Sequence, residues 1–161
     1  MIADTWGHGV LRWHANKWPA LRNSGDTTDA HSNRMAKMAL RLWGDYADWD
    51  LLAAIVLHDD SEGGPGGSGD VPGPIGGTSL GHAVKEHQML QEECRGTGRH
   101  LRGLSETDAA RLRFLDRLDA WRWASLVEPR ALADDGWPEC RAWLVEEACR
   151  LGVWDDVEEW L

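Results

Sequence analysis

The sequence predicts an all-α fold, a compact single-domain helical bundle that covers residues 1–161. Apolar residues recur at three- and four-residue spacing in several segments, which places them on one face of a helix. Residues that cap helices stand just ahead of these segments. No stretch alternates apolar and polar residues for long enough to predict a strand. A chain of this length is expected to form one domain around one core.

The first clear helix is expected to follow the run DTTD at residues 26–29, which offers several N-caps. In the next segment, AHSNRMAKMALRLW, the apolar residues have helical spacing and His31 shares their face. Residues 50–58 form a short and nearly all-apolar segment, so we expect a buried helix there. His58 and Asp59 close the end of this helix.

Further helices are expected in the second half of the chain. Residues 79–94 have an amphipathic pattern, although the segment is polar enough to be half exposed. Ser105 is placed to cap a long helix that ends ahead of Pro129. Residues 139–151 predict another amphipathic helix, and residues 153–161 predict a last short one.

Composition excludes several classes of function. The chain has 17 Lys and Arg against 27 Asp and Glu, a net charge of −10, so we expect no nucleic-acid partner. No apolar run is long enough to cross a bilayer and no leader-like start is present, so we expect a soluble, cytoplasmic protein with no membrane partner. The three cysteines are widely spaced, which favours free thiols in a reducing compartment. Most of the 11 tryptophans are expected in the core.

The dipeptide His58-Asp59 is the expected centre of a functional site. An imidazole beside a carboxylate offers a divalent metal one nitrogen and one oxygen ligand together. The glycine-rich stretch GGPGGSG follows, with Glu62 before it and Asp70 after it. Glycine lets a substrate come close to the backbone, whereas the simpler interpretation of this stretch is a flexible surface loop.

Two other residues are candidates for the same site. His31 lies in the first turn of its helix on the apolar face, where a lone histidine is more often structural than a ligand. Asp116 lies between inward-facing leucines of the long helix, and an aspartate there is costly unless it is paired or bound to a metal. Asp119, one turn further along, is expected to be more peripheral.

The ordered pattern H…HD…D on an all-helical chain resembles the HD-domain metal-dependent phosphohydrolase superfamily. The segments HSNRMA, AIVLHDDSE and GDVPGP look like motifs of the bacterial 5′-deoxynucleotidases of the YfbR type. They are also similar to those of the phage dATP triphosphohydrolases of the DatZ type. The segment LDRLDAW matches a further family segment, and the resemblance extends over residues 12–121.

The resemblance implies a divalent metal ion, with manganese, cobalt or zinc as first choices and magnesium as the alternative. The implied metal ligands are His31, His58, Asp59 and Asp116. Glu62 and Asp70 correspond to the catalytic and substrate-orienting acids. An Arg-Trp pair contacts phosphate and sugar in the family, and two pairs are candidates here. Arg12-Trp13 has the family residues and is favoured, while the pair that ends at Trp18 has the family spacing and is kept in reserve.

The implied activity is hydrolysis of 2′-deoxynucleotides at the α-phosphorus, with an activated water as the nucleophile. The first choice is a dATP triphosphohydrolase, which releases deoxyadenosine and triphosphate. The alternatives are a 5′-deoxynucleotidase that acts on monophosphates, an HD enzyme with another substrate, and a non-enzymatic helical binding protein. We expect a small-molecule deoxynucleotide as substrate and a homo-oligomeric assembly. Two features depart from the family: a longer loop between Glu62 and Asp70, and Ile75 in place of a basic residue.

Overall fold

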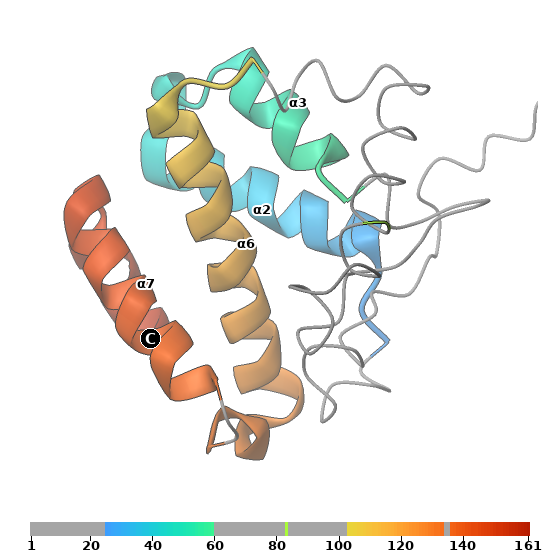
Figure 1. The fold of residues 1–161 in the computed structure, drawn as a ribbon, viewed down its shortest axis with the longest axis vertical. Coiled ribbons are helices and arrows are strands. Elements are labelled where there is room, and N and C mark those ends of the chain that lie inside the picture. The colour runs from blue at the N-terminus through green and yellow to red at the C-terminus, as the bar shows by residue number, and fades with distance from the viewer. Residues whose placement is uncertain (1–24, 60–82, 84–102, 134–135) are drawn as a thin grey trace, which may run out of the picture.

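The structure, a computed structural model, describes residues 25–59, 83, 103–133 and 136–161. These residues are mostly helical and include no β-strand, which confirms the predicted all-α fold class (Figure 1). The glycine-rich stretch and the helix expected at residues 79–94 lie outside the described residues, except for Ala83, which is helical.

Helix α2, Thr28–Trp43, begins where the cap-forming run predicts. The Thr27 side chain accepts a hydrogen bond from the backbone N–H of Ala30 at 3.2 Å, which satisfies one of the open donors at the helix start. The helix ends at Gly44, whose φ of 52° lies in the left-handed region that glycine adopts without strain. A short 3₁₀ turn, η2 (Gly44–Tyr46), follows.

Helix α3, Trp49–Leu57, is capped by the Asp48 side chain, which accepts a hydrogen bond from the Leu51 N–H at 3.0 Å. Its inner face is buried, as expected. The expectation of a wholly buried helix is wrong for the outer face, because Trp49 is 74 % and Val56 58 % exposed. A single helix on the outside of a bundle can bury only the face that contacts its neighbours.

Helix α6, Glu106–Val127, is the longest described helix, and it packs against α2 and α3 on one side and α7 on another (Figure 1). The predicted cap is confirmed. Ser105 Oγ accepts from the Asp108 backbone N–H at 3.1 Å and donates to the Asp108 carboxylate at 2.6 Å. Because α6 packs against helices on two sides, the side chains at its centre lie between α2 and α3 on one side and α7 on the other.

The C-terminal part continues with a 3₁₀ turn, η4 (Pro129–Ala133), and helix α7 (Trp137–Leu151). Helix α8 (Trp154–Val157) and the 3₁₀ turn η5 (Glu158–Trp160) complete the described chain. The two helices predicted here are present, although the last is shorter than expected because it tightens into the 3₁₀ turn. None of the described helices is both long enough and apolar enough to span a membrane.

One apolar core connects α2, α3, α6 and α7. Its largest fully buried apolar side chains are Met35, Leu51, Ile55, Phe114, Leu115, Leu118, Trp137 and Leu144. Among the described tryptophans, three are buried, and one of them, Trp121, donates its indole N–H to the Trp160 carbonyl at 3.1 Å. The core thus fixes α2, α3 and α6 against one another, and these are the elements that carry the candidate site.

Candidate metal centre

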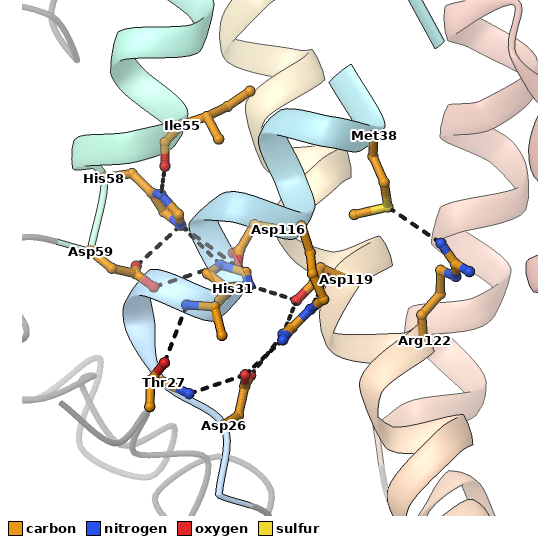
Figure 2. Close-up of polar contacts among 12 residues, drawn as sticks. Asp26, Thr27, His31, Met38, Ile55, His58, Asp59, Asp116, Asp119 and Arg122 are labelled. Atoms are coloured by element: carbon orange, nitrogen blue, oxygen red, sulfur yellow. Dashed lines mark hydrogen bonds and ion pairs between the residues drawn. The ribbon is translucent and has the colours of Figure 1, made fainter. Parts of the chain in front are cut away.

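The candidate site forms where α2, α3 and α6 meet. His31 comes from the first turn of α2, His58 and Asp59 follow the end of α3, and Asp116 comes from the middle of α6. Figure 2 shows these four side chains pointing toward one another. His31, His58 and Asp116 each offer one ligand atom, and these atoms all lie within 4.8 Å of one another. This group of side chains could hold a metal ion.

The spacing of the three atoms suits a shared ion. His31 Nε2 lies 3.3 Å from His58 Nε2 and 3.3 Å from Asp116 Oδ1. The third separation, from His58 Nε2 to Asp116 Oδ1, is 4.0 Å. Ligands about 2.0–2.2 Å from one ion lie roughly 3–3.5 Å apart in tetrahedral or octahedral geometry. Two of the three separations lie in this range, and the third is about half an ångström wider.

Asp59 brings a second carboxylate to the same place. Its Oδ1 lies 3.2 Å from His58 Nε2, and its Oδ2 lies 3.7 Å from His31 Nε2. The residue is 7 % exposed, so this carboxylate faces both imidazoles from a nearly buried position. Asp59 therefore adds a second carboxylate beside the two imidazoles, next to the group formed by His31, His58 and Asp116.

The hydrogen bonds on the far side of each imidazole fix which nitrogen is available. His58 Nδ1 donates to the Ile55 carbonyl at 2.8 Å, since a carbonyl can only accept. His31 Nδ1 donates to the Asp119 carboxylate at 2.7 Å. In each neutral ring, Nε2 then carries a lone pair. Two such lone pairs 3.3 Å apart repel each other unless a cation, either a proton or a metal ion, lies between them.

A charged network holds His31 from behind. The Arg34 guanidinium donates to both Asp119 oxygens at 2.7 Å, and to both Asp26 oxygens at 2.9 and 3.0 Å. Asp26 and Asp119 are each 2 % exposed, so two buried carboxylates share one arginine. A carboxylate on the outer nitrogen of a metal-binding histidine is a frequent arrangement, because it orients the ring and raises its basicity.

The network also sets the ionisation of its members. Burial disfavours the charge of Asp119, but hydrogen bonds from Arg34 and His31 outweigh burial and lower the pKa of the carboxyl group. Burial likewise disfavours the charged guanidinium of Arg34, but its hydrogen bonds to Asp119 and Asp26 raise its pKa. Asp119 is therefore ionised at neutral pH and accepts a hydrogen bond from the N–H of His31 Nδ1.

The structure corrects the expected order of burial along α6. Asp119 is buried rather than peripheral, whereas the Asp116 side chain is 37 % exposed. The reason is that Asp119 faces Arg34 on α2, whose two hydrogen bonds offset the cost of burying the carboxylate. Asp116 instead lies on the outer side of the cluster.

The sequence analysis assigned no role in the site to Asp26, Arg34 or Asp119, although Asp26 was among the candidate N-caps. A signal was present in the spacing, because Arg34 follows His31 by one helical turn and Asp119 follows Asp116 by one turn. On two facing helices, such pairs can place His31 and Asp116 together as metal ligands, and Arg34 and Asp119 one turn away as the residues that orient them. The remaining predicted site residues lie outside the described part of the chain: Arg12, Trp13, Trp18, Glu62 and Asp70.

Comparison with known proteins gives no family, since no family model, curated protein or solved structure matches this chain. The functional interpretation of the site therefore depends on its geometry and on the sequence motifs.

Proposed function

We propose that this chain is an HD-type, metal-dependent phosphohydrolase that acts on 2′-deoxynucleotides. The observation that carries the proposal is the pair of His31 and His58 Nε2 atoms, 3.3 Å apart, with carboxylate oxygens beside both. Both rings are held through Nδ1, so both Nε2 lone pairs are directed at the same point.

The donor set matches a catalytic divalent ion. His31 and His58 would supply neutral nitrogen ligands, and Asp59 and Asp116 would supply two negative charges that balance a 2+ ion. Such an ion, when bound, activates a water nucleophile and offsets charge on a phosphate oxygen. Asp119 would keep the His31 ring oriented by accepting a hydrogen bond from its Nδ1–H. The proton would then stay on Nδ1, and Nε2 would stay available as a ligand.

The cluster has an inner and an outer side. The His31 side chain is fully buried, whereas the Asp116 side chain is 37 % exposed to solvent. A substrate phosphate would therefore approach from the side of Asp116 and not from the side of His31. This asymmetry is typical of a catalytic site, because a structural metal site is closed on all sides.

The choice of substrate rests on the sequence motifs. Glu62 would act as general acid or base and Asp70 would orient the substrate, while Arg12 would pair with phosphate. Trp13 would pack against the sugar, where a ribose 2′-hydroxyl would lose hydrogen bonds; Trp18 is the reserve candidate. On this basis the first candidate substrate is dATP, with deoxyadenosine and triphosphate as products, and the alternative is a deoxynucleoside monophosphate.

A substrate panel tests the proposal. Purified protein is incubated with manganese or cobalt and with dATP, ATP, dAMP, AMP, dGTP and dCTP, and the products are separated by ion-exchange chromatography. Triphosphate released from dATP supports the first candidate. Orthophosphate released only from monophosphates supports the 5′-nucleotidase alternative. No hydrolysis of any of these compounds, in a preparation with one bound metal ion per chain, would contradict the proposed activity.

Two substitutions provide a matched control for this panel. Asp116→Ala removes a cluster carboxylate and is expected to abolish turnover. Asp50→Ala removes an exposed carboxylate from the first turn of α3 and should leave turnover unchanged. Equal activity in the two variants would show that hydrolysis does not depend on the cluster of His and Asp side chains.

A further inference from the structure

A second candidate site lies on the surface formed by α2, α6 and the C-terminal turn. It is a cavity of about 250 Å³ whose lining includes the basic residues Arg34, Lys37, Arg41 and Arg122 and the indoles of Trp123 and Trp160. Among the described residues, Asp119 is the one acidic residue in this lining. Four cations around one cavity stand out in a chain with a net charge of −10. Figure 2 shows Arg122, beside Met38, apart from the His and Asp side chains of the metal centre.

Three of the four cations have no acidic partner within the described residues. Arg34 is held by Asp26 and Asp119, whereas no described carboxylate forms an ion pair with Lys37, Arg41 or Arg122. Surface cations are often unpaired, but these three line the same hollow. Their charges are therefore available to an anion that enters the cavity.

Tryptophan rings hold the guanidinium groups in place. The Arg122 Cζ lies 4.1 Å and the Arg41 Cζ 5.3 Å from the centre of the Trp160 ring, so one indole positions two arginines. Arg34 lies over Trp123 at 4.7 Å in the same cavity. A guanidinium whose orientation is fixed by an aromatic ring loses less freedom when it binds a ligand.

The local electrostatics favour an anion. Burial lowers the pKa of Arg122, and the neighbouring charges of Arg41 and Arg34 lower it further, although Asp119 acts in the opposite direction. The surroundings of Arg122 thus disfavour its positive charge. A bound anion would offset the repulsion between Arg122 and the neighbouring Arg41 and Arg34.

We propose that this cavity binds a small phosphate-bearing anion, at a site beside the metal centre that shares with it the supporting residues Arg34 and Asp119. Guanidinium groups match phosphate oxygens with two parallel hydrogen bonds, which supports phosphate over a halide or a single carboxylate. A volume of about 250 Å³ lies just below the roughly 300–1,000 Å³ of typical small-molecule pockets, so it suits one or two phosphate groups rather than a whole nucleotide. The phosphates come either from a free inorganic anion or from the end of a larger molecule.

Titration calorimetry with inorganic pyrophosphate tests the proposal. The metal-free wild-type protein and the His58→Ala variant are compared at low ionic strength, because the metal centre is disabled in the variant. We expect the same pyrophosphate affinity in both, and a weaker affinity at high salt. This result would hold even if the chain hydrolyses no nucleotide, so the outcome is independent of the proposed function. Orthophosphate and dATP, titrated in parallel, distinguish a free anion from the end of a larger molecule.

Arginine substitutions locate the bound anion. Arg122→Gln is expected to weaken pyrophosphate binding about tenfold or more, as for a lost charged hydrogen bond, and Arg122→Lys to weaken it less. Arg117→Gln is the matched control, because Arg117 is also on α6 and also lies 4.1 Å from a tryptophan ring, that of Trp143, outside the cavity. Circular dichroism checks that each variant is folded.

Three results would overturn the proposal. The first is absence of phosphate and pyrophosphate binding at millimolar concentration by the wild type. The second is an equal loss of affinity in the Arg117→Gln and Arg122→Gln variants, or in Arg117→Gln and Arg122→Lys if Arg122→Gln does not fold. The third is loss of binding in His58→Ala, which would place the anion at the metal centre.

Discussion

The two sides of α6 differ in what they bury. Toward α2, the Asp119 carboxylate contacts Arg34 and His31, and all three groups are charged or polar. Toward α7, Trp121 meets Trp137 edge to face with ring centres 5.9 Å apart, and the other buried residues of α7 are also apolar. Both sides of α6 belong to the apolar core, and among the described residues only the side toward α2 also buries an ionic cluster.

The stability of the fold explains the residues that α6 buries toward α7, but not the charged groups that it buries toward α2. Apolar packing stabilises a bundle without further partners. Burying carboxylates and a guanidinium has a large desolvation cost, and a buried ion pair is often no more stabilising than apolar residues of the same size. The ionic side of α6 is thus poorly explained by stability, whereas a requirement to hold His31 in one orientation explains it directly.

We expect the largest effect from replacing Asp119, because this acid contributes both to the stability of the ionic cluster and to the orientation of His31. Asp119→Ala leaves Arg34 and His31 without their shared partner, so we expect a loss of about 3–5 kcal/mol in the free energy of unfolding. We also expect the metal affinity to fall about 10- to 100-fold, because the His31 ring loses its support. Urea denaturation and a cobalt titration measure the two quantities. An unchanged metal affinity would mean that Asp119 is only a structural partner.

A substitution on the other side should separate stability from metal binding. Leu144 on α7 is fully buried, so Leu144→Ala is expected to cost about 2–5 kcal/mol of unfolding free energy. The metal affinity of the folded protein should stay at the wild-type value, since Leu144 belongs to the apolar side. A parallel fall in metal affinity would show that the two sides of α6 are not independent.

A smaller effect is expected in the pH dependence of stability. The pKa of Asp119 is lowered in the folded protein, so its contribution is fully present above its unfolded value of about 3.9 and is lost as the pH falls through the lower folded value. In Asp119→Asn, the free energy of unfolding should therefore fall less steeply with acidification below about pH 4. Identical slopes in the wild type and in Asp119→Asn would contradict the role of ionised Asp119.

Features determined by neighbouring residues could be predicted from the sequence. The caps at Thr27 and Ser105 depend on residues three positions apart. Ser105 is the predicted cap, and Thr27 is one of the several candidates in the run at residues 26–29. The helical spacing placed His31 on an inner face, where it is fully buried. These predictions succeeded because each depends on contacts within a single helix.

The burial of Asp119 could not be predicted in this way. Its partner Arg34 lies 85 positions away in the sequence, and nothing within α6 indicates which of its three aspartates meets that arginine. The same limit applies to the cavity at Arg122, whose charge comes from α2 as well as α6. Such features depend on how helices face one another, which periodicity within one helix does not determine.

We propose that His31, His58, Asp59 and Asp116 together hold one divalent ion. The most direct measurement is the metal content of the protein after loading with cobalt and dialysis, determined by mass spectrometry for the wild type and for His58→Ala. The visible absorption of the bound cobalt reports its ligands in the same samples. We predict one ion per wild-type chain and none in folded His58→Ala. Equal cobalt content in the two proteins, or none in the wild type, would contradict the claim.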